Sequence, residues 1–182
     1  MSIEFPGFSG PVVGTEAPLE MLAACHIRIE RQCATLERLA SHLEEHGADD
    51  QARRAAQNII RYFESAAVDH HADEEEDLFP ALIESMAGSD AVCIREIIDG
   101  LADDHRALEA AWRRLRPALL DIAQGTPTPL ATNNVSTFTD LYRRHIQRED
   151  DELLPMAARL LGDVELAQIG RAMRERRGIP AV

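Results

Sequence analysis

Two histidine–glutamate pairs in this sequence have the spacing of metal ligands on one face of a helix. His70 is followed four residues later by Glu74, and His145 is followed at the same distance by Glu149. Residues at this spacing share a helix face. A buried carboxylate is very costly unless it is paired or bound to a metal, and a buried imidazole needs a partner for each ring nitrogen. The pattern therefore predicts that these side chains coordinate cations.

The two pairs belong to an internal repeat. Residues 70–80 (HHADEEEDLFP) and 145–155 (HIQREDDELLP) both read H-x-x-x-E, then three acidic residues, two apolar residues and a proline. The offset is 75 residues, and a second match, at an offset of 79, aligns His26 with His105. The sequence thus predicts two helical hairpins related by a pseudo-twofold axis, each giving two histidines and one glutamate to the interior. The predicted metal ligands are His26, His70, Glu74, His105, His145 and Glu149.

One choice of ligands stays open within the first motif. His71 and Glu75 also form a pair four residues apart. The repeat, counted back from the proline, favours His70 and Glu74 instead.

The other polar residues near these motifs are not among the six predicted ligands. Glu30 and Glu109 each follow a candidate histidine by four residues and are possible further ligands or hydrogen-bond acceptors for ligands. His42 and His46 lie off the apolar stripe and are predicted to be surface or capping residues. The other acidic residues of the motifs are predicted to be solvated: Glu75, Glu76, Asp77, Asp150, Asp151 and Glu152.

The elements that must position these ligands are four long helices. Apolar residues recur at spacings of three and four in each of four segments, and the segments are separated at 46–47, 88–90 and 124–134. Such helices bury one another's apolar faces. The predicted fold is all-α: an antiparallel up-down four-helix bundle over residues 19–182, with an irregular N-terminal arm at 1–18. A short fifth helix is predicted from Asp163 to the arginine-rich stretch before Gly178.

Composition narrows the class of protein. The 182 residues suit one domain, and the net charge of −13 argues against nucleic acids and anionic membranes as partners. No apolar run reaches the length of a transmembrane helix, and the N-terminus lacks the pattern of a secretory signal. Three cysteines without paired spacing fit a reducing cytoplasm, with Cys25 and Cys33 as small buried hydrophobes. The N-terminal arm and the arginine-rich C-terminal end are predicted to be solvated.

The ligand types indicate which metal binds. Imidazole and carboxylate without thiolate suit iron, zinc or manganese. Six side chains are too many for one tetrahedral zinc ion, and they suit two ions bridged by two carboxylates. The histidine-rich set also differs from carboxylate-rich di-iron bundles, which use E-x-x-H motifs. The donor set therefore favours two ions, and iron, zinc and manganese all stay open as the metal.

The paired motifs at 70–80 and 145–155 resemble those of the hemerythrin-like cation-binding family, and the resemblance covers residues 19–160. It implies a di-iron centre with an oxo or hydroxo bridge. Oxygen-carrying hemerythrins have H-x-x-x-H on the third helix, whereas His105 is followed in this sequence by Glu109. The ligand set is more similar to the di-iron domain of iron–sulfur-cluster repair proteins linked to nitric oxide stress. Those proteins usually carry an N-terminal domain with a cysteine pair, which this sequence lacks.

Together these observations predict a cytoplasmic di-iron protein that binds, senses or responds to oxygen, nitric oxide or peroxide. Two alternatives remain open. One is an enzyme, a di-iron oxidase or peroxidase or an iron-handling enzyme. The other is a regulatory helical bundle with a structural metal, acting through a protein partner.

Overall fold

The computed structural model describes residues 14–85 and 91–180, and every regular element in these ranges is a helix. The prediction of an all-α chain is confirmed. Most of the predicted N-terminal arm, residues 1–13, lies outside the described residues. The elements are α1 (Pro18–His46), α2 (Asp50–Phe63), α3 (Ala66–Ala72), the π-helical turn η1 (Asp73–Leu78), α4 (Phe79–Ser85), α5 (Ala91–Ala123), α6 (Thr132–Arg148), the π-helical turn η2 (Glu149–Leu153), α7 (Leu154–Leu160) and α8 (Asp163–Arg176).

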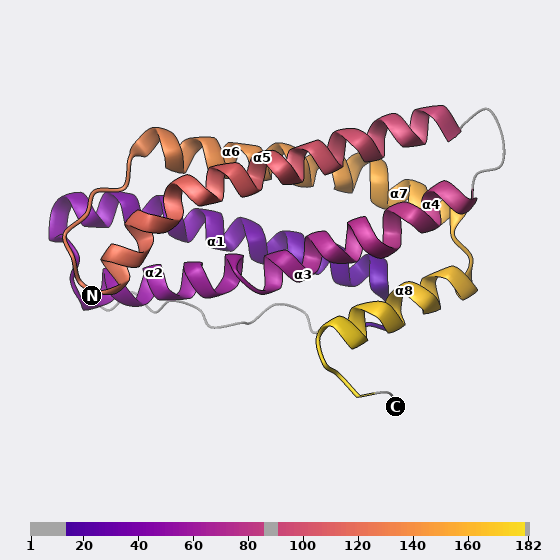
Figure 1. The fold of residues 1–182 in the computed structure, drawn as a ribbon, viewed down its shortest axis with the longest axis horizontal. Helices are drawn as coiled ribbons and strands as arrows, with labels where there is room; N and C mark the ends of the chain where they lie inside the picture. The colour runs from indigo at the N-terminus through magenta and orange to yellow at the C-terminus, as the bar shows by residue number, and fades with distance from the viewer. Residues whose placement is uncertain (1–13, 86–90, 181–182) are drawn as a thin grey trace.

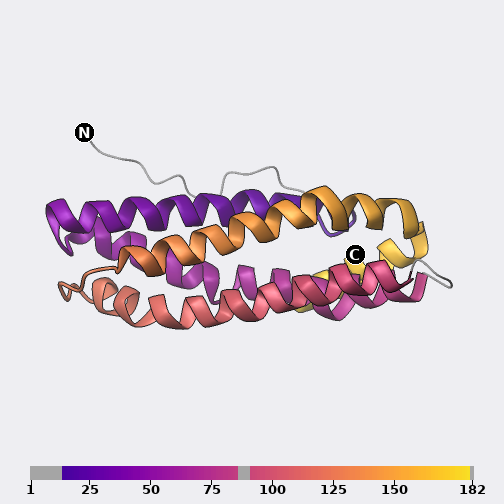
Figure 2. The ribbon, with the colours of Figure 1, turned by 90° about the horizontal axis from the view of Figure 1, so that it is seen from above.

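These elements form four long rods that lie side by side (Figures 1 and 2). The first rod is α1, the second runs from α2 through η1 to α4, the third is α5, and the fourth runs from α6 through η2 to α7. Each rod packs against two others, with α1 and α5 each lying against both α2 and α6. Successive rods run in opposite directions in Figure 1. The short α8 crosses one end of the bundle and contacts α1 and η1.

Local sequence explains where the first two helices end and begin. Pro18 occupies the first turn of α1, where its missing N–H is not needed. Gly47 ends α1 with a φ of 67°, a left-handed conformation that glycine adopts without a Cβ clash. The Asp49 side chain then accepts a 2.8 Å hydrogen bond from the Ala52 N–H and caps α2. The predicted break at residues 46–47 is therefore where the chain turns.

The second rod is less regular than the sequence predicts. The apolar spacing predicts one helix through His70, but α2 ends at Phe63 and α3 starts at Ala66. The hydroxyl of Ser65 donates a 2.6 Å hydrogen bond to the Arg61 carbonyl, and its N–H bonds to the Tyr62 carbonyl. A serine that satisfies nearby backbone groups in this way competes with the helical pattern.

Two apolar cores fill the bundle, one on each side of a polar layer. One includes Ile59 and Phe138, and the other includes Leu101, Leu153 and Met173. Along the first three rods a histidine separates residues of one core from residues of the other, and along the fourth the change comes just after Ile146, the residue next to His145. The buried charged and imidazole side chains therefore lie between the two apolar cores: His26, His70, Asp73, Glu74, His105, His145 and Glu149.

Candidate metal centre

A π-helical turn follows the histidine in both ligand motifs. A regular α-helix turns about 100° per residue, so each four-residue step drifts by about 40° around the axis. In the first motif His70, Glu74 and Leu78 are nevertheless all 0% exposed. The wider turns η1 and η2 take up the drift and keep three residues, spaced four apart, facing inward. Such turns are frequent at functional sites.

A proline follows each of these π turns. Pro80 and Pro155 lack a backbone N–H, and the ring of each would crowd the carbonyl four residues earlier in a regular α-helix. Loosening the preceding turn relieves that contact. The repeated proline thus explains why both motifs unwind at matching positions.

The structure brings all six predicted ligands together. Their ligand atoms form two groups, within each of which the atoms lie no more than 4.8 Å apart. Both groups include Glu74 and Glu149. One group adds His26 and His70, and the other adds His105 and His145.

Each glutamate spans the two groups with its two oxygens. Oε1 of Glu74 lies 3.5 Å from Nε2 of His70, and Oε2 lies 3.3 Å from Nε2 of His105. Glu149 does the same, with Oε2 at 3.1 Å from Nε2 of His26 and Oε1 at 3.1 Å from Nε2 of His145. One oxygen on each side is the geometry of a carboxylate that bridges two ions.

Several ligand atoms of this layer lack a hydrogen-bond partner in the described part of the chain. Two ligands about 2.1 Å from one ion and at right angles lie about 3 Å apart, close to the spacings between these side chains. Both oxygens of Glu74 and of Glu149 and both nitrogens of His70 are buried without a hydrogen-bond partner among the described residues. Leaving such groups unsatisfied costs about 1–3 kcal/mol each, and more for charged groups. Bound cations would satisfy them, so the residues fit a metal centre.

Two acidic residues predicted to be solvated also hold the ligand histidines. Nδ1–H of His26 donates to Asp150 over 2.7 Å, and Nδ1–H of His105 donates to Glu75 over 2.6 Å. This arrangement leaves the Nε2 lone pair facing the centre, as second-sphere carboxylates do at metal sites. Both carboxylates keep an exposed side, but the prediction missed their partners because each contact joins different hairpins. Asp151 and Glu152 are exposed, as predicted.

The surroundings set the charges of the metal-free centre. Burial opposes a charge on His26, but the Asp150 hydrogen bond and the facing glutamates raise its pKa to about 12. The pKa of His105 is raised in the same way, against burial, by Glu74 and Glu75. Burial lowers the pKa of His70 well below its usual value. Burial raises the pKa of Glu149, but the facing His145 and His26 outweigh it and hold that pKa well below its usual value. In the metal-free centre these pKa shifts favour a proton on His26 and on His105 and the ionised form of Glu149.

Sequence reasoning missed Asp73, which is 0% exposed beside Glu74. Arg177 donates to both of its oxygens, at 3.0 and 2.5 Å, and Arg176 donates to Oδ1 at 2.5 Å. The arginine-rich end of the chain is therefore not simply solvated, and it fastens α8 to η1. The Arg176 guanidinium also pairs with the last two acidic residues of the motif, Glu76 and Asp77, which were predicted to be solvated.

Two further glutamates that the spacing admitted as ligands lie away from the centre. Glu30 is exposed, and Glu109 is 68% exposed and faces Arg113. His46 lies on the surface as predicted, whereas His42 is half-buried and contacts a helix cap without being one. Nε2 of His42 lies 3.0 Å from the capping carboxylate of Asp49, and the His46 side chain is 55% exposed.

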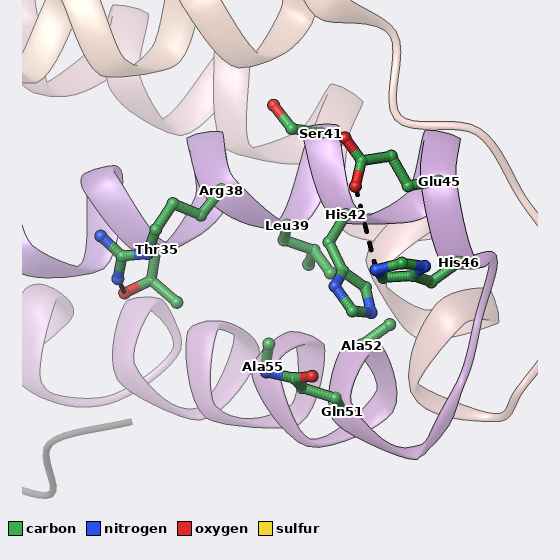
Figure 3. A pocket seen from close by; sticks show the side chains of 10 residues that line it. All are labelled: Thr35, Arg38, Leu39, Ser41, His42, Glu45, His46, Gln51, Ala52 and Ala55. Carbon is green, nitrogen blue, oxygen red and sulfur yellow. Dashed lines mark hydrogen bonds and ion pairs between the residues drawn. The ribbon is translucent and has the colours of Figure 1, made fainter. Parts of the chain in front are cut away.

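A separate pocket opens between α1 and α2, where these two histidines lie (Figure 3). Leu39, Ala52 and Ala55 contribute apolar surface to it, and Arg38 lies at its rim. None of the six candidate ligands lines this pocket.

The four rods and the two shared glutamates define a helical bundle that binds cations in its interior. The model of the hemerythrin HHE cation-binding domain matches residues 17–157, and the chain belongs to that family. An uncharacterized protein of Haemophilus influenzae is 32% identical over 162 residues, covering 89% of this chain and 91% of that protein. In the described part of the chain, no helix is both long and apolar enough to cross a membrane.

Proposed function

We propose that this protein binds two iron ions and uses them to bind, sense or respond to a small oxidant. His26 and His70 would hold one ion, and His105 and His145 the other. Glu74 and Glu149 would bridge them. The observation that carries the proposal is the placement of one oxygen of each buried glutamate toward each histidine pair, at 3.1–3.5 Å.

The donor set suits a pair of iron ions. Four imidazoles and two carboxylates without a thiolate suit iron, and they exceed what one tetrahedral zinc ion takes. When bound, a pair of ferrous ions would supply two electrons for the reduction of a diatomic or a peroxide. Membership of a cation-binding family supports the same assignment.

The protein's own residues prepare the centre for such a ligand. The six side chains are at most 5% exposed, and the apolar cores on both sides exclude bulk water. Asp150 and Glu75 fix the ring orientation of one histidine on each ion. A small, uncharged or singly charged oxidant suits a site enclosed in this way, whereas a large substrate does not.

Metal content together with visible absorption tests the proposal. Protein loaded with ferrous iron without oxygen and then exposed to air should hold two irons per chain and develop the absorption bands of a coupled di-ferric pair. His70→Ala and Glu149→Ala should lose iron, whereas the matched control His42→Ala should keep both ions. One zinc ion, no metal, or equal iron content in all three variants would contradict the proposal.

A second measurement separates a sensor from an enzyme. Steady consumption of hydrogen peroxide or nitric oxide over many turnovers by the iron-loaded protein would indicate an oxidase or peroxidase. A single stoichiometric reaction would indicate a binder or sensor.

A further inference from the structure

The repeat that duplicates the ligands breaks at one position beside the centre. At the offset of 75 residues, His71 in the first motif corresponds to Ile146 in the second. Ile146 is 3% exposed and belongs to one of the apolar cores. One half of the centre therefore has an imidazole where the other half has a hydrocarbon.

His71 is aimed at the half of the centre that contains His105 and His145. One of its ring nitrogens lies within 4.8 Å of a ring nitrogen of each. Its Nε2 is buried and has no hydrogen-bond partner among the described residues. A buried ring nitrogen of this kind needs a hydrogen-bond partner, and no group in the described part of the chain supplies one.

The orientation of the ring argues against direct coordination of the ion. His71 stacks on His105 with ring centroids 4.1 Å apart and planes at 17°. An ion lies in the plane of an imidazole that binds it, along the nitrogen lone pair. Two nearly parallel, stacked rings do not share such a point, so His71 in this position serves as a neighbour of the ion and not as a ligand.

We propose that His71 makes the two halves of the centre unequal by donating a hydrogen bond from Nε2–H to a small anion bound at the His105–His145 ion. This proposal rests on the proposed function. The ligand class is a two- or three-atom anion with an acceptor at its end. The His26–His70 ion offers such a ligand no equivalent donor, because Ile146 stands at the matching position. His71 is a positioning residue for the ligand and leaves iron binding to the other six side chains.

Azide titration of the iron-loaded protein, followed by visible absorption, tests this role. His71→Ile copies the residue of the other half and should bind azide roughly tenfold more weakly, the effect of one lost hydrogen bond to a charged group. His71→Gln keeps an N–H donor and should stay within about threefold of the wild type. Ile146→Val is the matched control and should bind azide as the wild type does. All four proteins should hold two irons.

The outcomes distinguish a failure of the His71 hydrogen bond from a failure of the proposed function. Wild-type protein that does not take up two irons would overturn the proposed function and, with it, this inference. Two irons and equal azide affinity in His71→Ile and wild type would overturn the inference alone. One iron in His71→Ile would show that His71 is a ligand, which also overturns it.

Discussion

The hairpin with His70 and Glu74 and the hairpin with His145 and Glu149 present matching ligands in different surroundings. The duplicated part extends beyond the ligands. His26 bonds to Asp150 of the opposite hairpin at 2.7 Å, and His105 bonds to Glu75 at 2.6 Å. The pseudo-twofold axis therefore covers both the ligands and the carboxylates that orient them.

The two halves differ in how they are anchored. Asp73 is fully buried and held by two arginines of the C-terminal end. Its counterpart at the offset of 75 residues is Arg148, which lies 2.9 Å from Asp104 in a pair that is one-third exposed. The candidate ligands and their hydrogen-bond acceptors are thus duplicated, whereas the attachment of each half to the rest of the bundle is not.

The largest expected effect tests whether the halves share their glutamates. Glu74→Ala and Glu149→Ala should each lose both ions, whereas His105→Ala should mainly lose one. A metal at a thousandfold excess over its Kd stabilises by about 4 kcal/mol, so losing it should lower Tm by on the order of 10 °C. Metal analysis and thermal unfolding of loaded protein measure both. Loss of a single ion from Glu149→Ala would show that the halves are independent.

The next effect tests whether the orienting carboxylates are equivalent. Asp150→Asn and Glu75→Gln should each weaken metal binding by about 10–100-fold, because each removes the charged acceptor of one ligand histidine. Competition with a chelator of known affinity measures the change. Asp151→Asn is the matched control, since that side chain is exposed. Clearly unequal losses in the first two variants would break the pseudo-symmetry.

A third effect tests the difference in anchoring. Asp73→Ala should destabilise the metal-free protein by about 2–3 kcal/mol, since it breaks a buried ion pair and leaves two arginines without their main acceptor. Arg148→Ala should cost less than about 1 kcal/mol, because its ion pair is partly solvated. Urea unfolding of both variants gives the comparison. Equal destabilisation would show that α8 does not anchor the first half preferentially.

The smallest effect is a dependence of stability on pH. Because the folded-state pKa of His26 is raised to about 12, its contribution is complete below the unfolded value near 6.5 and is lost as pH rises. Between pH 7 and 8 this one group should reduce the free energy of unfolding of the metal-free protein by about 1.4 kcal/mol. Urea unfolding at the two pH values measures the slope. Asp150→Asn should flatten it, and a slope unchanged by that variant would show that the Asp150 hydrogen bond is not its origin.

The sequence alone predicts the helices and the six side chains that the structure brings together. Both follow from regular spacing: His70 and Glu74 share a helix face, and His26 lies on the same stripe as Leu22 and Ile29. Periodicity reports which way a residue faces relative to its own helix. The direction of each side chain is enough to predict the set of buried residues when the apolar faces of four helices pack into one interior.

The contacts that join distant elements could not be predicted in this way. Asp150 and His26 form a hydrogen bond although they are 124 residues apart in the sequence, and Asp73 and Arg176 do so at a separation of 103 residues. Each lies in an acidic run in which most members would be solvated, and no local pattern distinguishes the paired members. The π turns have a clearer signal in the sequence, because a proline stands at the same distance after the histidine of both motifs.

Because Asp73 and Arg176 are far apart in the sequence, their contact forms late in synthesis. Synthesis proceeds from the N-terminus, so Glu74 emerges long before Glu149 and before the arginines that hold its neighbour. A nascent chain that ends before His105 has two histidines and one glutamate of the centre, with no second hairpin to cover them. All six candidate ligands can therefore surround a cation only after Glu149 has left the ribosome.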